Sequence, residues 1–361
     1  MFDKPDKTIL ENWIKGEGDE PPVVSDRDLS EQAYEGIVLD GGVFQNTAFK
    51  RCCLQGASMR QSTFVNCDFS QADLTGSDME DAKFVNVTAH GALLQQSKLV
   101  NVNFIESDLS GASLQGADIS GINFVHSDLS RSLLKAVNGD NVNFVGCRFE
   151  ATDFSESQFN RANFMEPDFK DVVVEQVHWK LPFFYKANLC GQDFTSNTMI
   201  MPQFQESCLA QTNFSGMDVT QAGFSKADLN GACFSGACIN NGMFLGASLR
   251  DVDFSGAQLV QAMMIEASCV GADFTKANMY QAQLAKANCD SALFTKANLI
   301  YVDFSNANLS YSDCSETQLD SANLHEIIDY KTLWQGANKS AAKSTDENRR
   351  QAQQFTAGVK P

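Results

Sequence analysis

The sequence lacks long hydrophobic runs and has few basic residues. No stretch approaches the roughly 18 apolar residues that a membrane-spanning helix needs, so we expect no membrane insertion. Lys plus Arg number 27 against 45 Asp plus Glu, and the formal net charge is −18. Direct nucleic-acid binding is not expected, because a basic surface supplies most of the affinity for phosphate. Residues 1–15 mix charged and apolar side chains, which predicts no signal peptide.

Histidine is rare, and cysteine follows no metal-binding pattern. The 11 Cys are odd in number and scattered, which predicts free thiols in a reducing, cytoplasmic compartment. Export by a route that needs no signal peptide stays open. The sequence shows no metal or cofactor motif, and its His residues are too far apart for a nucleophile–base pair to be placed, so we expect no enzyme. These residues are His90, His126, His178 and His325.

Tyrosine and tryptophan are also rare, at 6 and 3 residues, whereas phenylalanine occurs 27 times. This imbalance indicates that one aromatic residue type serves one repeated purpose. From Leu29 to Leu324 a bulky apolar residue recurs at almost every fifth position, and a small residue, usually Ala, stands two positions before most of them. Asp or Asn often lies between the two. Ala89 and Gly139 lack the usual bulk, and we expect room for a larger side chain there.

A period of five residues fits neither an α-helix, with a period of 3.6, nor a β-strand, with a period of 2. It fits a chain that turns a corner every five residues and sends one large side chain inward from each side. Four such sides make a coil of twenty residues, and this second period is present. One column at twenty-residue spacing consists of Phe44, Phe64, Phe84, Phe104, Phe124, Phe144, Phe164, Phe184, Phe204, Phe224 and Phe244.

These features resemble the pentapeptide-repeat family, whose consensus is Ala-(Asp/Asn)-Leu-X-X, over about residues 27–324. The resemblance implies an all-β solenoid, namely a right-handed quadrilateral parallel β-helix of about 15 coils with short terminal caps. It also implies a bacterial protein.

A solenoid exposes its core at both ends unless they are capped. The expected segments are an N-terminal cap with a short helix (1–26), the β-helix (27–324), a C-terminal cap (325–335) and a polar tail that is flexible or partly helical (336–361). The apolar residues expected to close the last coil are Ile327, Ile328, Leu333 and Trp334. The stretch 167–217 has proline or polar residues at several small-residue positions, which predicts altered strands or a bend and no domain boundary.

One outward face is apolar. The residue after each Phe of the long column is apolar seven times running, whereas the equivalent positions on two other faces are mostly polar. Because strand propensity alone would act on all faces, this apolar stripe indicates an interface with a protein partner or a second copy. The apolar stripe consists of Val65, Val85, Ile105, Val125, Val145, Met165 and Tyr185. Further apolar residues around it are Leu181, Phe183, Ile200 and Met201, and an asparagine ladder beside it consists of Asn103, Asn123, Asn143 and Asn163.

Outward aspartates recur on two other faces, just before the inward residue. This position suits solubility and turn geometry. One face carries Asp68, Asp108, Asp128, Asp168 and Asp228, and the other carries Asp73, Asp153, Asp193, Asp253 and Asp273. The family resemblance implies an alternative role for them, because some members resemble duplex DNA in size and charge and bind type II topoisomerases such as gyrase.

The sequence therefore predicts a non-catalytic protein–protein interaction scaffold that binds a partner or a second copy through the apolar stripe. The alternatives are a DNA-mimicking gyrase binder and an effector or accessory protein of a specialised bacterial secretion system.

Overall fold

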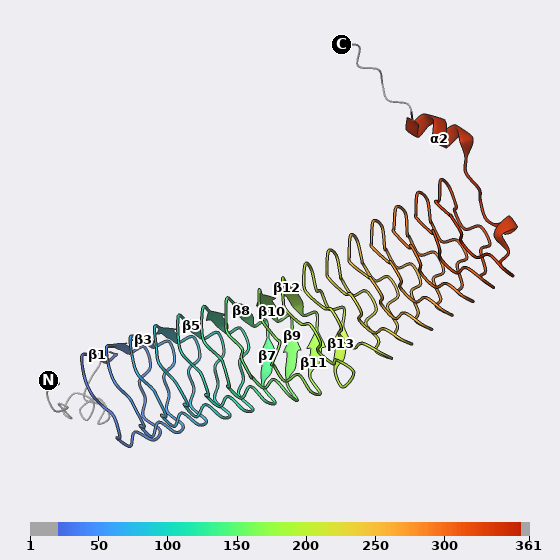
Figure 1. Cartoon of the computed structure of the whole chain (residues 1–361). Helices are drawn as coiled ribbons and strands as arrows, with labels where there is room; N and C mark the ends of the chain where they lie inside the picture. The colour runs from blue at the N-terminus through green and yellow to red at the C-terminus, as the bar shows by residue number, and fades with distance from the viewer. Residues whose placement is uncertain (1–20, 355–361) are drawn as a thin grey trace, which may run out of the picture. The chain divides into compact units, whose positions relative to one another are not determined.

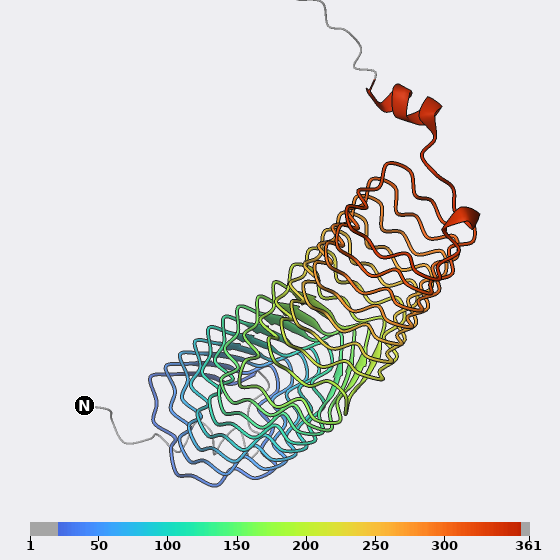
Figure 2. The same cartoon turned by 45° about the vertical axis from the view of Figure 1, so that its right-hand side comes forward.

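The structure is a computed structural model that describes residues 21–354. In this part of the chain the fold is an all-β parallel solenoid. Its β-bridges join residues twenty positions apart, as in Asp28–Ala48 and Ala48–Asp68, and Figures 1 and 2 show the successive coils from two sides. The prediction of an all-β solenoid with a twenty-residue coil is confirmed. The helix expected within residues 1–26 falls mainly on residues 1–20, outside the described part.

Each five-residue repeat combines a buried side chain with a turn. The N–H of the buried residue donates to the next coil (Phe69 to the Thr88 carbonyl, 2.6 Å). In many repeats whose buried residue lies outside a named strand, the N–H of the small residue three positions later closes the turn (Ala72 to the Phe69 carbonyl, 2.9 Å). The residue before the small one adopts a positive φ, which is +57° at Gln71. Glycine, as at Gly76 with φ +66°, adopts this conformation without steric cost. The chain therefore turns a corner every five residues.

Short strands form two sheets within residues 21–354. The nine-stranded parallel sheet contains, in spatial order, β1 (Val23–Ser25), β2 (Val43–Gln45), β3 (Thr63–Val65), β4 (Lys83–Val85), β5 (Asn103–Ile105), β6 (Asn123–Val125), β8 (Asn143–Val145), β10 (Asn163–Met165) and β12 (Phe183–Tyr185). The four-stranded sheet contains β13 (Thr198–Ile200), β11 (His178–Lys180), β9 (Gln158–Asn160) and β7 (Asn138–Asp140). From Gln203 onward isolated bridges such as Gln203–Gly223 join the coils.

Two helical segments follow the last coils, η1 (Lys339–Ala341) and α2 (Glu347–Gln354). Of the helices that the structure describes, none has the length and apolar character needed to cross a bilayer.

The described chain divides into two compact units. The first comprises residues 21–188 and 196–199, and the second comprises residues 189–195 and 200–354. The division falls within 167–217, the stretch that the sequence predicts to be irregular. Pro182 and Pro202 stand at small-residue positions in this stretch. Because proline has no N–H, neither can donate a turn hydrogen bond as Ala72 does. Among the described residues, Val142 and Ala162 at the equivalent positions of the preceding coils make no such bond either.

The buried aromatic columns form the core of each unit. In the first unit the ring centroids of Phe44 and Phe64 are 4.9 Å apart and the rings are stacked. In the second unit Phe214 and Phe234 stack in the same way, also at 4.9 Å. All four side chains are fully buried. Their placement confirms the inward register that the five-residue period predicts.

Gly139 does not leave the room that its missing side chain suggests. A Cβ atom at this position would lie 2.8 Å from Phe159 Cδ1 and 2.9 Å from Val142 Cγ2. Phe159 is the partner of Gly139 in the pairing of β7 with β9. Its ring therefore fills the space that a larger residue at 139 would take, and the expectation of spare volume is wrong at this position.

Gly139→Leu should destabilise the first unit by about 1–3 kcal/mol, because overpacking forces side chains out of their preferred rotamers. A thermal denaturation series measures the effect. Asn138→Leu is the matched control, since Asn138 is exposed in the same strand and the substitution should be near neutral. An unchanged midpoint for Gly139→Leu would show that Phe159 does not occupy this space.

The C-terminal end also differs from the expectation. The coil continues past Leu324, since β-bridges join Asn308 to Ile328 and Asp313 to Leu333. Ile328 and Leu333 are each 58% exposed. Both stand one position before the five-residue register, so they lie on the outside and do not close the core.

Candidate interaction surface

The apolar stripe follows one sheet of the first unit. Its members are paired across successive strands, with Val65 opposite Val85, Val85 opposite Ile105 and Ile105 opposite Val125. The same register continues through Val145 and Met165 to Tyr185 in β12. Ile105 is 36% exposed, and the other six side chains are half-buried. In-register strands lie about 4.8 Å apart, so each side chain packs against its neighbours in the stripe.

The asparagine ladder lies two residues before the stripe. Asn123 Nδ2 donates to Asn103 Oδ1 at 3.0 Å, and Asn143 Nδ2 donates to Asn123 Oδ1 at 2.8 Å. Asn163 extends the series, and Phe183 replaces asparagine in the next strand. Asn163 Oδ1 is buried and has no hydrogen-bond partner among the described residues. The ladder ties the strands together along the edge of the stripe.

The additional apolar residues are divided between the two units. Leu181 and Phe183 are half-buried in the first unit, and the ring of Phe183 stacks on Tyr185 at 6.3 Å. Ile200 and Met201 belong to the second unit, where they are 55% and 38% exposed. The first pair therefore extends the stripe within its own unit, and the second pair belongs to the other unit.

A further set of exposed aliphatic residues escaped the sequence analysis. Leu93, Leu133 and Val173 are 40%, 45% and 40% exposed on a different wall of the first unit. They recur every second coil, and Ser113 and Asp153 stand between them. The alternation of aliphatic and polar residues at this position is visible in the sequence. It shows that the aliphatic residues form no continuous strip.

All ten aspartates of the two acidic faces support turns. In each, Oδ1 accepts the backbone N–H of the residue two positions later. The distance is 2.9 Å for both Asp68 with Ser70 and Asp193 with Thr195. Hydrogen bonds from Thr195 hold the pKa of the Asp193 carboxyl below its usual value. The position of these carboxylates follows from the turn geometry, as one of the two interpretations of the sequence expects.

Two histidines do approach hydroxyl groups, contrary to the expectation from the sequence. His90 Nδ1 lies 2.9 Å from Ser110 Oγ, and His178 Nδ1 lies 2.7 Å from Thr198 Oγ1. Both pairs are exposed and join residues twenty positions apart, which the solenoid stacks at every position. The four His residues lie in different coils, and their mutual spacing gives no indication of a hydroxyl group in the next coil. The same stacking produces the asparagine ladder, so the contacts do not by themselves indicate catalysis.

A groove of about 600 Å³ lies beside His90 in the first unit. Arg148 pairs with Asp128 at 2.5 Å, and Arg131 pairs with Glu150 at 3.4 Å along its lining. Because both guanidinium groups already face carboxylates, the groove offers no concentrated positive charge for an anionic ligand. Across residues 21–354 no cluster of three or more His, Cys, Asp or Glu has the arrangement of a metal site.

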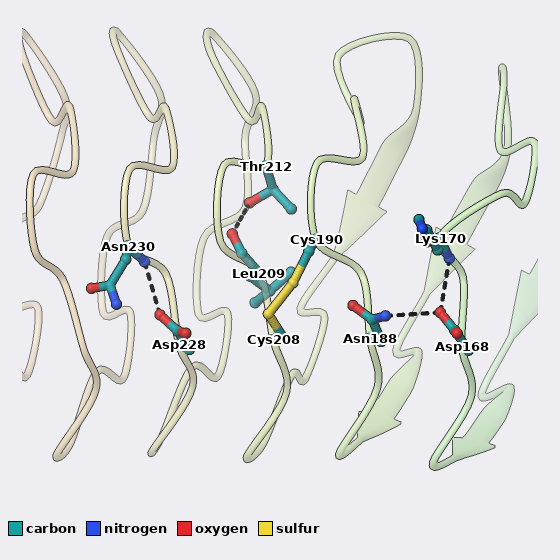
Figure 3. Close-up of a disulfide and its surroundings, with 9 residues drawn as sticks. All are labelled: Asp168, Lys170, Asn188, Cys190, Cys208, Leu209, Thr212, Asp228 and Asn230. Carbon is teal, nitrogen blue, oxygen red and sulfur yellow. Dashed lines mark hydrogen bonds between the residues drawn. A yellow bond between two sulfur atoms is a disulfide. The ribbon is translucent and has the colours of Figure 1, made fainter.

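Cys190 and Cys208 form a disulfide in the second unit (Figure 3). The expectation that all 11 thiols are free is therefore wrong. The two residues are 18 positions apart, the same offset as Gln55–Asp73 and Asp40–Ser58, whose side chains are hydrogen-bonded at 2.6 Å. This offset joins the residue after one inward side chain to the residue before another in the next coil. Cysteines at these two positions were the signal that the sequence analysis missed.

Several free cysteines lie in the core. Burial raises the pKa of Cys67 and of Cys147 to about 11 in each case. The pKa of Cys289 is raised by a hydrogen bond with Cys269 and by burial. Cys269 and Cys289 are free and fully buried, as expected for small hydrophobic residues of the core.

Comparison with solved structures finds distant likeness to several proteins. QnrB1, a plasmid-mediated fluoroquinolone resistance protein, is 15% identical, with 61% of this chain and 92% of that chain covered and a TM-score of 0.34. HetL, a pentapeptide repeat protein involved in heterocyst differentiation regulation in Nostoc sp. strain PCC 7120, is 17% identical, with 95% and 98% covered and a TM-score of 0.17. A pentapeptide repeat protein from the thylakoid lumen of Arabidopsis thaliana is 26% identical, with 31% and 68% covered and a TM-score of 0.22. No curated protein matches the chain.

The comparison with family models identifies the repeat. The model described as "Pentapeptide repeats (8 copies)" matches residues 52–88, 90–124, 143–176, 203–241, 244–281 and 287–325. These segments make up more than half of the chain and fall within the coils described above. The chain belongs to the pentapeptide-repeat family.

Proposed function

We propose that the protein is a non-catalytic interaction scaffold, and that it binds a protein partner or a second copy along the apolar stripe of the first unit. We further propose that its coils are right-handed and quadrilateral, about 15 in number, as in the β-helix that the family implies.

The observation that carries this proposal is the continuity of the stripe. Its seven residues occupy equivalent positions on successive strands from β3 to β12. Six steps of about 4.8 Å give a strip roughly 29 Å long. An extended apolar strip on a protein surface favours association with another extended surface. The aliphatic residues Leu93, Leu133 and Val173 are more exposed than the stripe but are interrupted by polar side chains, so they offer no comparable strip.

The double variant Ile105→Lys with Val125→Glu tests the stripe. Both side chains lie outside the core, so the fold should be retained, and the new charges should abolish association along the strip. Light scattering measures self-association, and pull-down with the purified protein measures partner capture. A thermal melt checks that the variant is folded.

The matched control is Leu93→Lys with Leu133→Glu. It introduces the same two charges at exposed aliphatic positions on another wall of the same unit. This control should leave association unchanged. If the two double variants associate to the same extent, the apolar residues of the stripe reflect strand propensity and not binding.

The DNA-mimic alternative depends on the acidic faces. The turn hydrogen bonds explain why aspartate recurs at these positions, and so the regular spacing needs no resemblance to DNA. A gyrase supercoiling assay separates the two hypotheses. Inhibition that persists in the stripe double variant would favour the acidic faces over the stripe.

A further inference from the structure

The last coil of the second unit has an incomplete set of backbone hydrogen bonds. In the preceding coil the N–H groups of Leu309, Tyr311, Cys314 and Glu316 donate to carbonyls of the next coil at 2.7–2.8 Å. The corresponding residues of the last coil are Asp329, Lys331, Trp334 and Gly336. Their N–H groups have no acceptor within the part of the chain that the structure describes. We call residues 328–336 the open edge.

The chain covers only the other half of this coil. The segment 338–345 accepts from Ser321 and Leu324 through the carbonyls of Ala341 and Lys343, at 3.0 and 2.9 Å. It then continues into α2, whose side chains from residue 347 to 352 are all exposed. The segment that caps one half of the coil thus ends before it reaches the open edge. A strand with unpaired donors is a template for another strand.

Apolar and aromatic side chains surround the open edge. Ile328, Tyr330 and Leu333 are each 58% exposed, and Tyr311 packs edge-to-face against Tyr330 at 5.5 Å. Trp334 Nε1 is buried and has no acceptor among the described residues. The edge therefore offers apolar contact area beside its backbone N–H groups.

The local charge is opposite to that of the whole chain. From 329 to 350 there are five basic and three acidic residues, whereas the full chain has a net charge of −18. Within the described chain, Lys331, Lys343 and Arg349 have no ion-pair partner, and Lys331 Nζ lies 5.3 Å from the centre of the Tyr330 ring. Two copies of this edge would bring the same cations together, which disfavours pairing with a second copy.

We propose that the open edge binds an extended acidic segment of a partner protein, which adds a strand to the last coil. Its carbonyl groups would accept from the four unpaired N–H groups, its apolar side chains would pack on Ile328 and Leu333, and its carboxylates would pair with Lys331 and Lys343. This is the mode of recognition in which backbone pairing provides affinity and side chains provide selectivity. The site is independent of the apolar stripe, which lies in the first unit.

A synthetic peptide with the sequence of residues 68–77 (Asp-Phe-Ser-Gln-Ala-Asp-Leu-Thr-Gly-Ser) is the probe. It carries two carboxylates and corresponds in coil position to the strand that would follow the open edge. Fluorescence anisotropy measures its binding to the full chain, and hydrogen exchange measures protection of the four amides. We expect binding that weakens with salt and slower exchange over 329–336.

Lys331→Glu with Lys343→Glu should weaken peptide binding about tenfold. Lys226→Glu with Lys276→Glu is the matched control, because it makes the same charge change in the second unit away from the edge, and it should have little effect. The peptide N-methylated on alternate amides should not bind if backbone pairing is required.

Unchanged exchange over 329–336 with saturating peptide, or equal binding by the two double variants, would overturn the proposal. A dimeric mass by light scattering with these amides already protected would also overturn it and assign the edge to a second copy. The stripe double variant should bind the peptide normally, so failure of the stripe and failure of the edge are distinguishable.

Discussion

Phe144→Ala should lower the free energy of unfolding by about 3–5 kcal/mol, the range for removal of a buried aromatic ring. The Phe144 side chain is 1% exposed. Its ring stacks between those of Phe124 and Phe164, at 5.3 and 4.7 Å, and meets Phe149 edge-on at 5.4 Å. The neighbours belong to a regular stack in which each ring is already paired, so they have little freedom to move into the cavity. Urea unfolding followed by circular dichroism measures the loss.

Two variants provide the control for this experiment. Phe144→Met keeps most of the volume and should cost less than Phe144→Ala. Val145→Ala changes the adjacent half-buried residue and should cost less still. If Phe144→Ala proves no more costly than Val145→Ala, the assignment of Phe144 to the inward register is wrong.

Cys208→Ser should destabilise the second unit by about 3 kcal/mol, because a disulfide across a short loop restricts the unfolded chain by roughly that amount. The loop between Cys190 and Cys208 spans 18 positions. The bond also joins the short segment 189–195 to the remainder of the second unit. Urea unfolding with and without reductant measures the effect, since reductant should bring the wild type to the level of the variant and leave the variant unchanged.

Cys233→Ser is the matched control, because Cys233 is a free, half-buried thiol of the same unit. Its substitution should have a small effect in both conditions. Alkylation under denaturing conditions without reductant gives an independent readout, in which Cys190 and Cys208 alone should stay unlabelled. Labelling of all 11 cysteines would contradict the disulfide. The expectation of a reducing, cytoplasmic compartment depended on free thiols, and the disulfide removes that argument.

The sequence predicted the features that each five-residue repeat determines locally. An inward residue such as Phe69, a small residue such as Ala72 and a left-handed corner between them are set by neighbours within one repeat. Four five-residue repeats make up one coil and so give the twenty-residue register. The Phe column and the apolar stripe could therefore be located from the sequence alone.

The features that the sequence did not predict depend on contacts between coils. The space beside Gly139 is filled by the ring of Phe159, which belongs to the next coil. The disulfide joins Cys190 to Cys208, 18 positions later in the next coil. The open edge exists because the segment 338–345 stops short of it, which no pattern within a repeat indicates. The division into two units falls in the stretch that contains Pro182 and Pro202, and no pattern within a single repeat locates it.

The fixed offset of twenty residues constrains how such a gene can change in length. Duplication or loss of twenty codons within the regular coils would keep every column aligned, so the ring stacks and the asparagine ladder would simply gain or lose one layer. A change of five codons would preserve the inward positions and rotate everything downstream by one wall. After such a change, the downstream residues of the apolar stripe would lie in line with a polar wall of the upstream coils. Selection for a continuous binding strip would therefore favour growth by whole coils, even though the core would accept single repeats.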